Sequence, residues 1–184
     1  MAVTTHDDTE LLRLFSAPET KERAFTDIIK KYQERLYWHV RRLVVGHDDA
    51  NDVLQNVFIR VWNGLENFRQ DSQLYTWLYR VATNECLSFL EQQKKRSSVS
   101  LSDVEGGLSN KIKADKDFDA NKIEWKLQVA IQQLPEKQRA VFSLRYYDEM
   151  PYEEMSRVLE TSEGALKASY HHAVKKIEDY ILNH

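Results

Sequence analysis

Residues 134–177 read LPEKQRAVFSLRYYDEMPYEEMSRVLETSEGALKASYHHAVKKI, and this stretch decides the fold. Its apolar residues recur at helical spacing, and the segments DEMP and ETS interrupt that period. Pro135 suits the first turn of a helix, where its missing N–H has no partner to lose. The pattern predicts helices from Pro135 to about Tyr147, from Tyr152 to Leu159 and from Glu163 to about Leu182. A short helix, a tight turn and a longer helix form a helix-turn-helix arrangement.

The last of these helices has two faces of different chemistry. Its inward face is apolar and contains Leu166, Tyr170, Ala173, Val174, Ile177 and Ile181, with Ser162 able to cap the amides at the helix start. The opposite stripe contains Glu163, Lys167, His171 and Lys175 at every fourth position, with His172 and Lys176 beside them. Cations and hydrogen-bond donors on that side suit a recognition helix in the major groove of DNA. A solvated face of a helical bundle has the same spacing, so both interpretations stay open.

The rest of the chain also shows helical periods. The predicted helices run from about Ala24 to Val45, from after Gly46 to about Leu65, from about Ser72 to Arg96 and from roughly Lys122 to Gln133. The second begins with Asp48 or Asp49 as its cap and has the cleanest apolar period of the chain. No segment alternates between apolar and polar residues as a strand does. The sequence therefore predicts an all-α protein.

Residues 97–121 differ in composition from both flanking segments. They contain two of the five glycines, several serines and little apolar periodicity, which is typical of a solvated, flexible linker. The net charge of −3 counts against DNA binding, yet residues 24–96 carry 11 basic and 9 acidic residues. Residues 122–184 carry 9 basic and 10 acidic residues. Any DNA contact there must depend on local placement of charge or on a partner.

Aromatic and polar side chains gather in the third predicted helix. The group contains Tyr75, Trp77, Tyr79, Arg80, Asn84 and Phe89. Stacking surfaces beside cations and an amide suit single-stranded nucleic acid. Aromatic residues at this spacing can instead belong to a hydrophobic core. That interpretation is a strong alternative for Trp77, which lies between Leu74 and Leu78 on one face. Tyr75 and Tyr79 are expected to be more exposed.

Several classes of function find no support in the residues. There is no nucleophile elbow, phosphate-binding glycine loop or HExxH motif, so we expect a protein that is not an enzyme. Asp48, Asp49 and Asp52 lie at a helix start, where capping explains them. The single cysteine, Cys86, excludes an internal disulfide. Neighbouring histidines point about 100° apart on a helix, which disfavours a metal site. No apolar run suggests membrane insertion, and the start lacks the pattern of a signal peptide, so a cytoplasmic location is expected.

Two motifs in this order resemble a known family. Residues 48–68, DDANDVLQNVFIRVWNGLENF, and 74–96, LYTWLYRVATNECLSFLEQQKKR, resemble region two of the extracytoplasmic-function (ECF) sigma factors of the sigma-70 family. Residues 134–177 resemble region four of the same family. The resemblance implies an N-terminal segment at 1–23, region two as a helical bundle at 24–96, a linker at 97–121, and region four with its helix-turn-helix at 122–184.

The resemblance also implies roles for individual residues. Core polymerase would be bound by Asp52, Gln55, Asn56 and Arg60, on the polar side of the second predicted helix. The minus-ten element would be recognised and melted by Tyr75, Trp77, Tyr79, Arg80, Asn84 and Ser88. The minus-thirty-five element would be read by Ser162, Glu163, Lys167, Ser169, His171, His172, Lys175 and Lys176. Family members often carry arginines on this helix, and lysine does not reproduce the bidentate fork of arginine.

The resemblance implies three kinds of partner and no cofactor. The partners are core RNA polymerase, through its beta-prime clamp and beta flap, promoter DNA, and an anti-sigma factor. Two alternatives remain open from the residues alone. One is a helix-turn-helix regulator that binds duplex DNA through its second half and senses a signal with its first, which a dimer footprint on palindromic half-sites would favour. The other is a helical adaptor that binds only protein.

Overall fold

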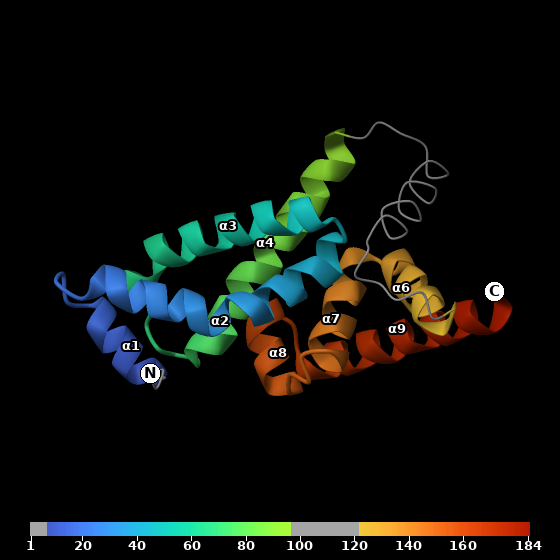
Figure 1. The fold of residues 1–184 in the computed structure, drawn as a ribbon. Coiled ribbons are helices and arrows are strands. Elements are labelled where there is room, and N and C mark those ends of the chain that lie inside the picture. The colour runs from blue at the N-terminus through green and yellow to red at the C-terminus, as the bar shows by residue number, and fades with distance from the viewer. Residues whose placement is uncertain (1–6, 97–121) are drawn as a thin grey trace.

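The computed structural model describes residues 7–96 and 122–184, and within these residues every regular element is a helix (Figure 1). The elements are α1 (Asp8–Phe15), α2 (Lys21–Val44), α3 (His47–Gly64), η1 (Leu65–Asn67), α4 (Leu74–Arg96), α6 (Lys122–Gln133), α7 (Glu136–Tyr146), α8 (Tyr152–Leu159) and α9 (Glu163–Asn183). The prediction of an all-α fold is confirmed. The predicted flexible linker at residues 97–121 lies outside the described residues.

Helices α2, α3 and α4 form the first module by packing their apolar faces together. Ile28 and Leu36 of α2, Val57 and Val61 of α3 and Leu78 of α4 are fully buried, at 0% exposure. These positions belong to the apolar periods of the sequence. Burying each such side chain contributes about 1.5–3 kcal/mol, so the shared core holds the three helices together.

Helix α1 was not among the predicted elements. Its residues Leu11 and Phe15 are buried in the core of the first module. The Phe15 ring meets the Trp62 ring edge to face, with centroids 5.5 Å apart. The carboxylate of Asp8 accepts hydrogen bonds from Lys31 Nζ and from the Tyr32 hydroxyl, both at 2.7 Å. A helix of eight residues is marginal on its own, and these tertiary contacts stabilise it.

The start of α3 differs from the prediction, because neither Asp48 nor Asp49 is the cap. Gly46 occupies the N-cap position with extended backbone, at φ −72° and ψ 136°, and both aspartates lie in the first helical turn. Their charge there complements the positive end of the helix dipole. A Cβ on residue 46 would lie 2.7 Å from Asp49 Oδ2. The close approach of this carboxylate explains why glycine fits the position.

Helices α6 to α9 form the second module, in which α6, α7 and α9 surround a separate apolar cluster, whereas α8 buries Met155 and Val158 in the cluster of the first module. Ile131 and Leu134 of the α6 end, Phe142 of α7, and Ala173 and Ile177 of α9 are the buried members of the separate cluster, together with Ala130. The predicted bounds of α6 and α8 agree with the structure. Pro135, expected in the first turn of α7, lies one residue earlier, at the N-cap position. A proline there still ends α6 and starts α7 at a defined point.

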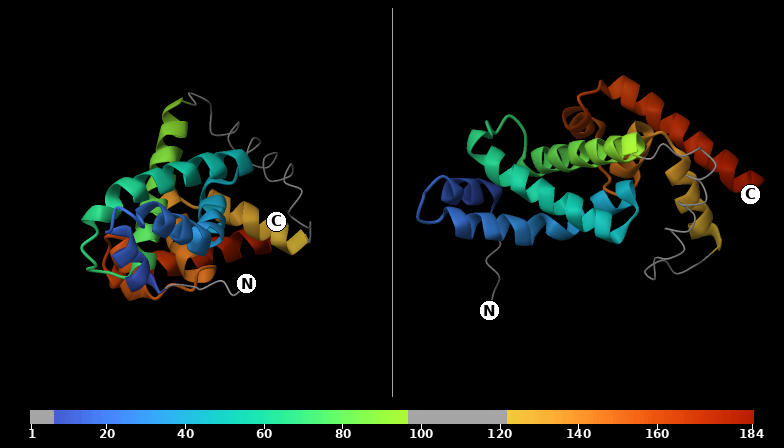
Figure 2. Two further views of the ribbon diagram at one scale, coloured as in Figure 1. Left: turned by 60° about the vertical axis from the view of Figure 1, so that its left-hand side comes forward. Right: turned by 90° about the horizontal axis from the view of Figure 1, so that it is seen from above.

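The two modules are packed against each other. Helix α8 lies along α4, and α7 contacts both α2 and α4. One apolar cluster continues from Leu11 of α1 through the first module to Met155 of α8 and Leu166 of α9. The right-hand view of Figure 2 shows α1 to α4 toward one side and α6 to α9 toward the other, with α9 extending away from the junction. The junction therefore buries surface of both modules. Among the described helices, none is both long and apolar enough to cross a membrane.

Candidate DNA and polymerase interfaces

Helix α9 presents the polar stripe that its sequence predicts. Leu166, Ala173 and Ile177 are buried, whereas Lys167, His171, His172, Lys175 and Lys176 are exposed, as are Ser162 and Glu163. Ser169 is half-buried. The Ser162 hydroxyl accepts a hydrogen bond from the Ala165 amide at 3.3 Å, so the predicted N-cap is confirmed. The capped start follows the short α8 directly, which gives the helix-turn-helix its geometry.

The charges on this stripe have weak internal partners. Lys167 Nζ lies 3.9 Å from a Glu163 carboxylate oxygen, with its side chain 60% exposed, and 5.6 Å from the Tyr152 ring centroid. Such exposed pairs contribute about 0.2–1 kcal/mol and exchange easily for another anion. The rings of His171 and His172 have centroids 6.0 Å apart. No group of three or more possible metal ligands occurs in the part of the chain that the structure describes.

Helix α3 presents a second polar stripe. Asp52, Gln55, Asn56 and Arg60 are all exposed, while Val53, Val57 and Val61 on the opposite side are buried. Arg60 forms an ion pair with Glu85 of α4. Ile59, 55% exposed, lies among these polar residues. A polar surface with one exposed aliphatic side chain at its centre suits contact with another protein.

Helix α4 holds the residues predicted to meet the minus-ten element, and it divides them between two environments. Arg80, Asn84 and Ser88 are exposed and recur every four residues, so they form one stripe along the helix. Trp77 is half-buried, with its ring centroid 5.2 Å from that of Phe68. A Cβ on Gly64 would lie 3.1 Å from the Trp77 ring. Trp77 is therefore mainly a packing residue in this conformation.

The expected exposure of Tyr79 is wrong. Its side chain is fully buried, at 0% exposure, and Tyr75 is half-buried beside it, with ring centroids 4.8 Å apart. Burial raises the pKa of both phenols, and the nearby Asp148 carboxylate raises the pKa of Tyr79 further. The physical reason is the second module, which covers this face of α4. The sequence of α4 alone does not show that another module packs on this face.

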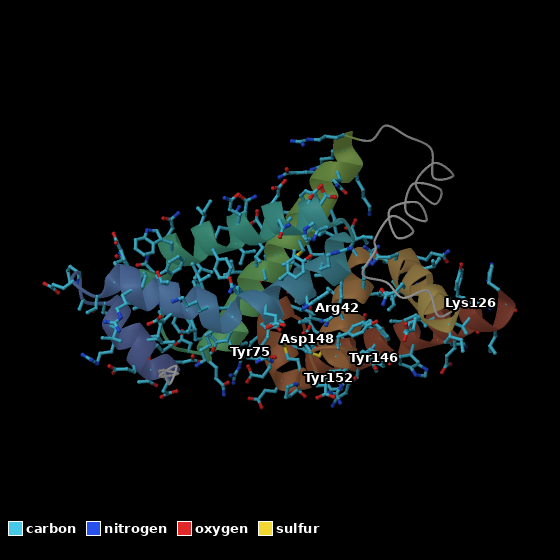
Figure 3. The ribbon with its side chains drawn as sticks, viewed as in Figure 1. Arg42, Tyr75, Lys126, Tyr146, Asp148 and Tyr152 are labelled. Carbon is cyan, nitrogen blue, oxygen red and sulfur yellow. The ribbon has the colours of Figure 1, made fainter. Side chains whose placement is uncertain are left out.

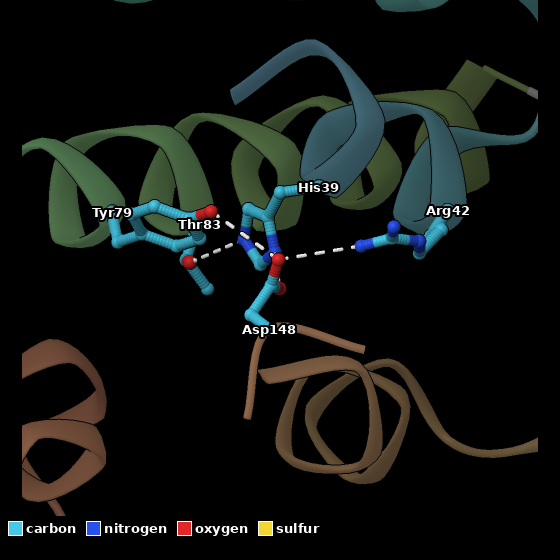
Figure 4. Close-up of polar contacts among 5 residues, drawn as sticks. All are labelled: His39, Arg42, Tyr79, Thr83 and Asp148. Carbon is cyan, nitrogen blue, oxygen red and sulfur yellow. Dashed lines mark hydrogen bonds and ion pairs between the residues drawn. The ribbon is translucent and has the colours of Figure 1, made fainter. Parts of the chain in front are cut away.

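Asp148, in the turn after α7, is the polar centre of the junction (Figures 3 and 4). Its side chain is 7% exposed and lies 3.3 Å from Arg42 Nη1. The Tyr79 hydroxyl donates to it at 3.2 Å, and so does His39 Nδ1, also at 3.2 Å. Because an ionised carboxylate only accepts hydrogen bonds, Nδ1 of His39 carries a proton. In the neutral imidazole the other ring nitrogen, Nε2, then accepts a hydrogen bond from the Thr83 hydroxyl at 2.9 Å.

The end of α2 is capped by side chains of the second module. Gln132 Nε2 donates to the Arg42 carbonyl at 2.9 Å, and Arg139 Nη1 donates to the Leu43 carbonyl at 3.0 Å. Carbonyls at a helix end have no partner within the helix, so these donors satisfy them. Burial lowers the pKa of Arg139 to about 10, and the nearby Glu136 carboxylate offsets only part of that effect. The guanidinium is held by carbonyl dipoles and remains charged at neutral pH.

His39, Asp148 and Arg139 were not among the residues singled out from the sequence. His39 did carry a signal, since it lies between Leu36 and Val40 on the inward face of an otherwise apolar helix. A polar residue on such a face needs a buried partner. The partner, Asp148, is 109 residues away, and helical periodicity says nothing about contacts at that separation.

Buried and half-buried phenols give the protein a predicted sensitivity to alkaline pH. Among the described residues, the tyrosines with a raised pKa in the fold are Tyr32, Tyr75, Tyr79, Tyr147 and Tyr170. The unfolded chain ionises its tyrosines near pH 10, whereas the folded chain keeps these protons to higher pH. Their contribution to stability is complete below about pH 10 and is lost as pH rises through the folded pKa. The lowered pKa of Arg139 changes the stability in the opposite direction as the pH rises, but it belongs to one group only.

We expect the free energy of unfolding to fall above pH 10, by up to about 1.4 kcal/mol per pH unit for each of the two buried tyrosines, Tyr32 and Tyr79. Urea unfolding at pH 8 and at pH 11 measures this. Tyr79→Phe, which removes one of these phenols and keeps the ring, should show a shallower fall than the native chain. Equal slopes for the two proteins would mean that Tyr79 titrates as it does in water.

Comparison with known proteins identifies the two modules. Residues 28–96 match the family Sigma-70 region 2, and residues 124–177 match the family Sigma-70, region 4. The chain is 32% identical over 165 residues to the RNA polymerase sigma-H factor of Pseudomonas aeruginosa, an alignment that covers 85% of this chain and 86% of that protein. It is 29% identical over 171 residues to the ECF RNA polymerase sigma-E factor of Escherichia coli K12, with 87% of each chain covered.

Solved structures of low sequence identity share the fold. CnrH in complex with the cytosolic domain of CnrY superimposes with a TM-score of 0.66 at 20% identity, over 94% of this chain and 95% of that one. The sigma factor RpoE in complex with the anti-sigma factor NepR, from Bartonella quintana, has a TM-score of 0.64 at 18% identity, over 85% of this chain and 96% of that one.

A region 2 bundle followed by a region 4 helix-turn-helix defines the class of RNA polymerase sigma factors. The chain belongs to the sigma-70 family and, within it, to the ECF sigma factors. It binds core RNA polymerase and directs promoter-specific initiation of transcription.

Proposed function

We propose that three separate helices divide the work of promoter recognition in this sigma factor. Helix α3 binds core polymerase, α4 meets the minus-ten element, and α9 reads the minus-thirty-five element. The observation that carries the proposal is the capped start of α9, where an exposed stripe of cations and donors faces solvent directly after the turn from α8. In helix-turn-helix proteins, residues near that start contact base edges in the major groove. Binding to promoter variants by holoenzyme tests the proposal.

The proposed polymerase site is the exposed stripe of α3, at Asp52, Gln55, Asn56 and Arg60. The helix keeps its fold through its buried valines, so side chains on the outer face can change without loss of the core. Polar groups at the centre of a protein interface contribute through direct hydrogen bonds to the partner. In this assignment the stripe meets the beta-prime clamp, and the second module meets the beta flap.

Gln55→Ala combined with Asn56→Ala should weaken binding of the beta-prime clamp by about tenfold or more. The variant loses two exposed hydrogen-bonding groups, each contributing about 0.5–1.5 kcal/mol, and retains the packed face of α3. Titration of a labelled clamp fragment measures the affinity. Gln133→Ala, an exposed amide at the end of α6, is the matched control and should bind as the native chain does. Native affinity of the double variant would remove α3 from the polymerase interface.

The proposed minus-ten surface combines the exposed stripe of Arg80, Asn84 and Ser88 with the aromatic rings of Tyr75, Trp77 and Tyr79 on the same helix. Stacking of an unpaired base on an aromatic ring contributes about 1–3 kcal/mol of binding free energy, and cations and amides bind the DNA backbone. Such a surface acts on strands that have separated. It therefore suits promoter melting better than reading of duplex DNA.

We further propose that an anti-sigma factor holds this protein inactive until an envelope or extracellular signal arrives, and that the protein acts in the cytoplasm without catalysing a reaction. A similar fold, that of the sigma factor RpoE, was solved in complex with the anti-sigma factor NepR. The exposed faces of α3 and α9 offer such a partner its contact surface. Purification from native cells, with and without envelope stress, should yield a stoichiometric partner only before stress. Recovery of polymerase subunits alone under all conditions would contradict this.

A further inference from the structure

Two adjacent histidines lie in the middle of the exposed stripe of α9. His171 is four residues after Lys167 and four before Lys175, so these three side chains share one line along the helix. Neighbouring residues of a helix point about 100° apart, which places His171 and His172 about 40° and 60° to either side of the direction opposite the buried face. Both rings are exposed. They therefore belong to the surface that is proposed to meet the minus-thirty-five element.

No partner on α9 fixes the charge of these two rings. Their centroids lie 6.0 Å apart, and among the described residues neither ring forms a hydrogen bond or an ion pair. The nearest cations along the helix are Lys167, Lys175 and Lys176. Glu163 lies beside Lys167, and Glu178 and Asp179 follow the histidines by seven residues, about two turns along the axis. A proton on either ring therefore adds to the positive charge of the stripe.

The acids of the neighbouring helices are engaged elsewhere. Helices α6, α7 and α8 pack against α9, and their acids in the described part of the chain are Glu124, Glu136, Glu153 and Glu154. Glu136 pairs with Lys94 of α4, the two acids of α8 pair with Arg157, and Glu124 lies near the Tyr147 phenol. The other exposed or half-buried ionisable groups described on these helices are cations and phenols, namely Lys126, Lys137, Arg145, Tyr146 and Tyr152. A charge gained by the histidines is therefore available to a partner outside the protein.

The charge of an imidazole depends on pH, whereas that of a guanidinium does not. Arginine stays protonated in proteins, and an ordinary histidine changes its charge near pH 6.5. A phosphate beside an imidazole favours the charged form, so binding of DNA to such a ring takes up a proton. By linkage, the part of the affinity that depends on this proton is present at low pH and is lost as the pH rises.

We propose that His171 and His172 make promoter recognition by this sigma factor depend on pH, so that holoenzyme binds the minus-thirty-five region more tightly in mildly acidic than in mildly alkaline solution. The inference rests on the proposed function of α9 and adds a regulatory input to the same surface. The signal is the proton itself, which binds the recognition helix directly. No second protein is needed to transmit it.

The first test measures binding of holoenzyme to two labelled promoter DNAs at pH 6 and at pH 8. One DNA contains the minus-thirty-five region, and the other is truncated so that it ends downstream of that region. The ratio of the two affinities cancels the effects of pH on polymerase and on histidines elsewhere in the chain. For the native chain this ratio should be about twofold to thirtyfold higher at pH 6, which is the range expected for two exposed ion pairs.

Variants of α9 test whether the two histidines are responsible. His171→Gln with His172→Gln keeps hydrogen-bonding side chains without a titratable group, and it should lose most of the rise at pH 6. His171→Lys with His172→Lys has a fixed charge and should bind at pH 8 about as tightly as the native chain does at pH 6. His184→Gln, at the exposed C-cap of α9, is the matched control and should keep the native rise. An equal rise in the native chain and in the glutamine variant would overturn the inference.

The salt dependence of binding gives a second readout. Two added phosphate contacts should make the salt slope of native holoenzyme steeper at pH 6 than at pH 8, by up to about 2. The lysine variant should show the steeper slope at both pH values. If the minus-thirty-five region improves native binding equally at both pH values, the inference alone fails. If that region improves binding at neither pH, α9 does not read it, and the proposed function fails together with the inference.

Discussion

Holoenzyme that carries Lys167→Glu is expected to prefer different minus-thirty-five sequences from native holoenzyme. Lys167 lies one turn into α9, on the exposed stripe, where a recognition helix meets base edges. A carboxylate there removes a donor to guanine acceptors and adds repulsion toward phosphates. Each wrong base pair in a site costs about 1–3 kcal/mol, which corresponds to roughly tenfold to a hundredfold in promoter use.

Lys175→Ala should behave differently, because it lies two turns further along the same stripe. At that distance a lysine meets a phosphate, which carries no sequence information. We expect a uniform loss across promoter variants and a reduction of the salt slope by about 1. In vitro transcription over a set of minus-thirty-five variants separates the two effects. Lys137→Glu makes the same charge change on an exposed position of α7 and should keep the native preference. Native preference in Lys167→Glu would leave α9 as an ordinary solvated helix.

Tyr79→Ala should lower the free energy of unfolding by about 3–5 kcal/mol, the usual cost of removing a large aromatic side chain from a core. The side chain is fully buried and donates to Asp148 at 3.2 Å. Tyr79→Phe keeps the ring and loses the hydrogen bond to a charged group, which predicts a loss of about 1.5–3 kcal/mol. Urea unfolding, read by helical circular dichroism, gives both values.

The control for this series is Tyr146→Ala, because Tyr146 is 51% exposed on α7. Its loss should stay near 1 kcal/mol or less, as for most substitutions of exposed residues. A loss below 1 kcal/mol in Tyr79→Ala would mean that α8 does not cover α4 in solution. The stability measurement therefore bears on the packing of α8 against α4 as well as on the core of the first module.

The fold was predictable where apolar spacing occurs beside a proline or a capping side chain. The bounds of α6 and α8 and the inward face of α9 follow from spacing, proline and the Ser162 cap. Helix α1 was missed because its eight residues depend on tertiary contacts. The Asp48 and Asp49 caps were wrong, since their charges act in the first turn and Gly46 holds the cap position.

Part of the candidate site was also predictable from helical periodicity. The exposed stripes of α3 and α9 lie on helices whose opposite faces are strongly apolar, so exposure follows from periodicity. Helix α4 is buried on several sides and has no such simple pattern. Tyr79 is covered by residues almost seventy positions away in the chain, such as Asp148. Only the packing of the two modules reveals that contact.

The most direct test of the account is transcription by purified core polymerase with this chain, on a promoter library randomised upstream of a fixed start region. If α9 and α4 each read DNA, the selected promoters will share two sequence blocks at a constant spacing, one near minus thirty-five and one near minus ten. Native chain should enrich both blocks, and Lys167→Glu should change only the upstream one. Selected promoters that share a single block, or none beyond those of core enzyme alone, would contradict the account.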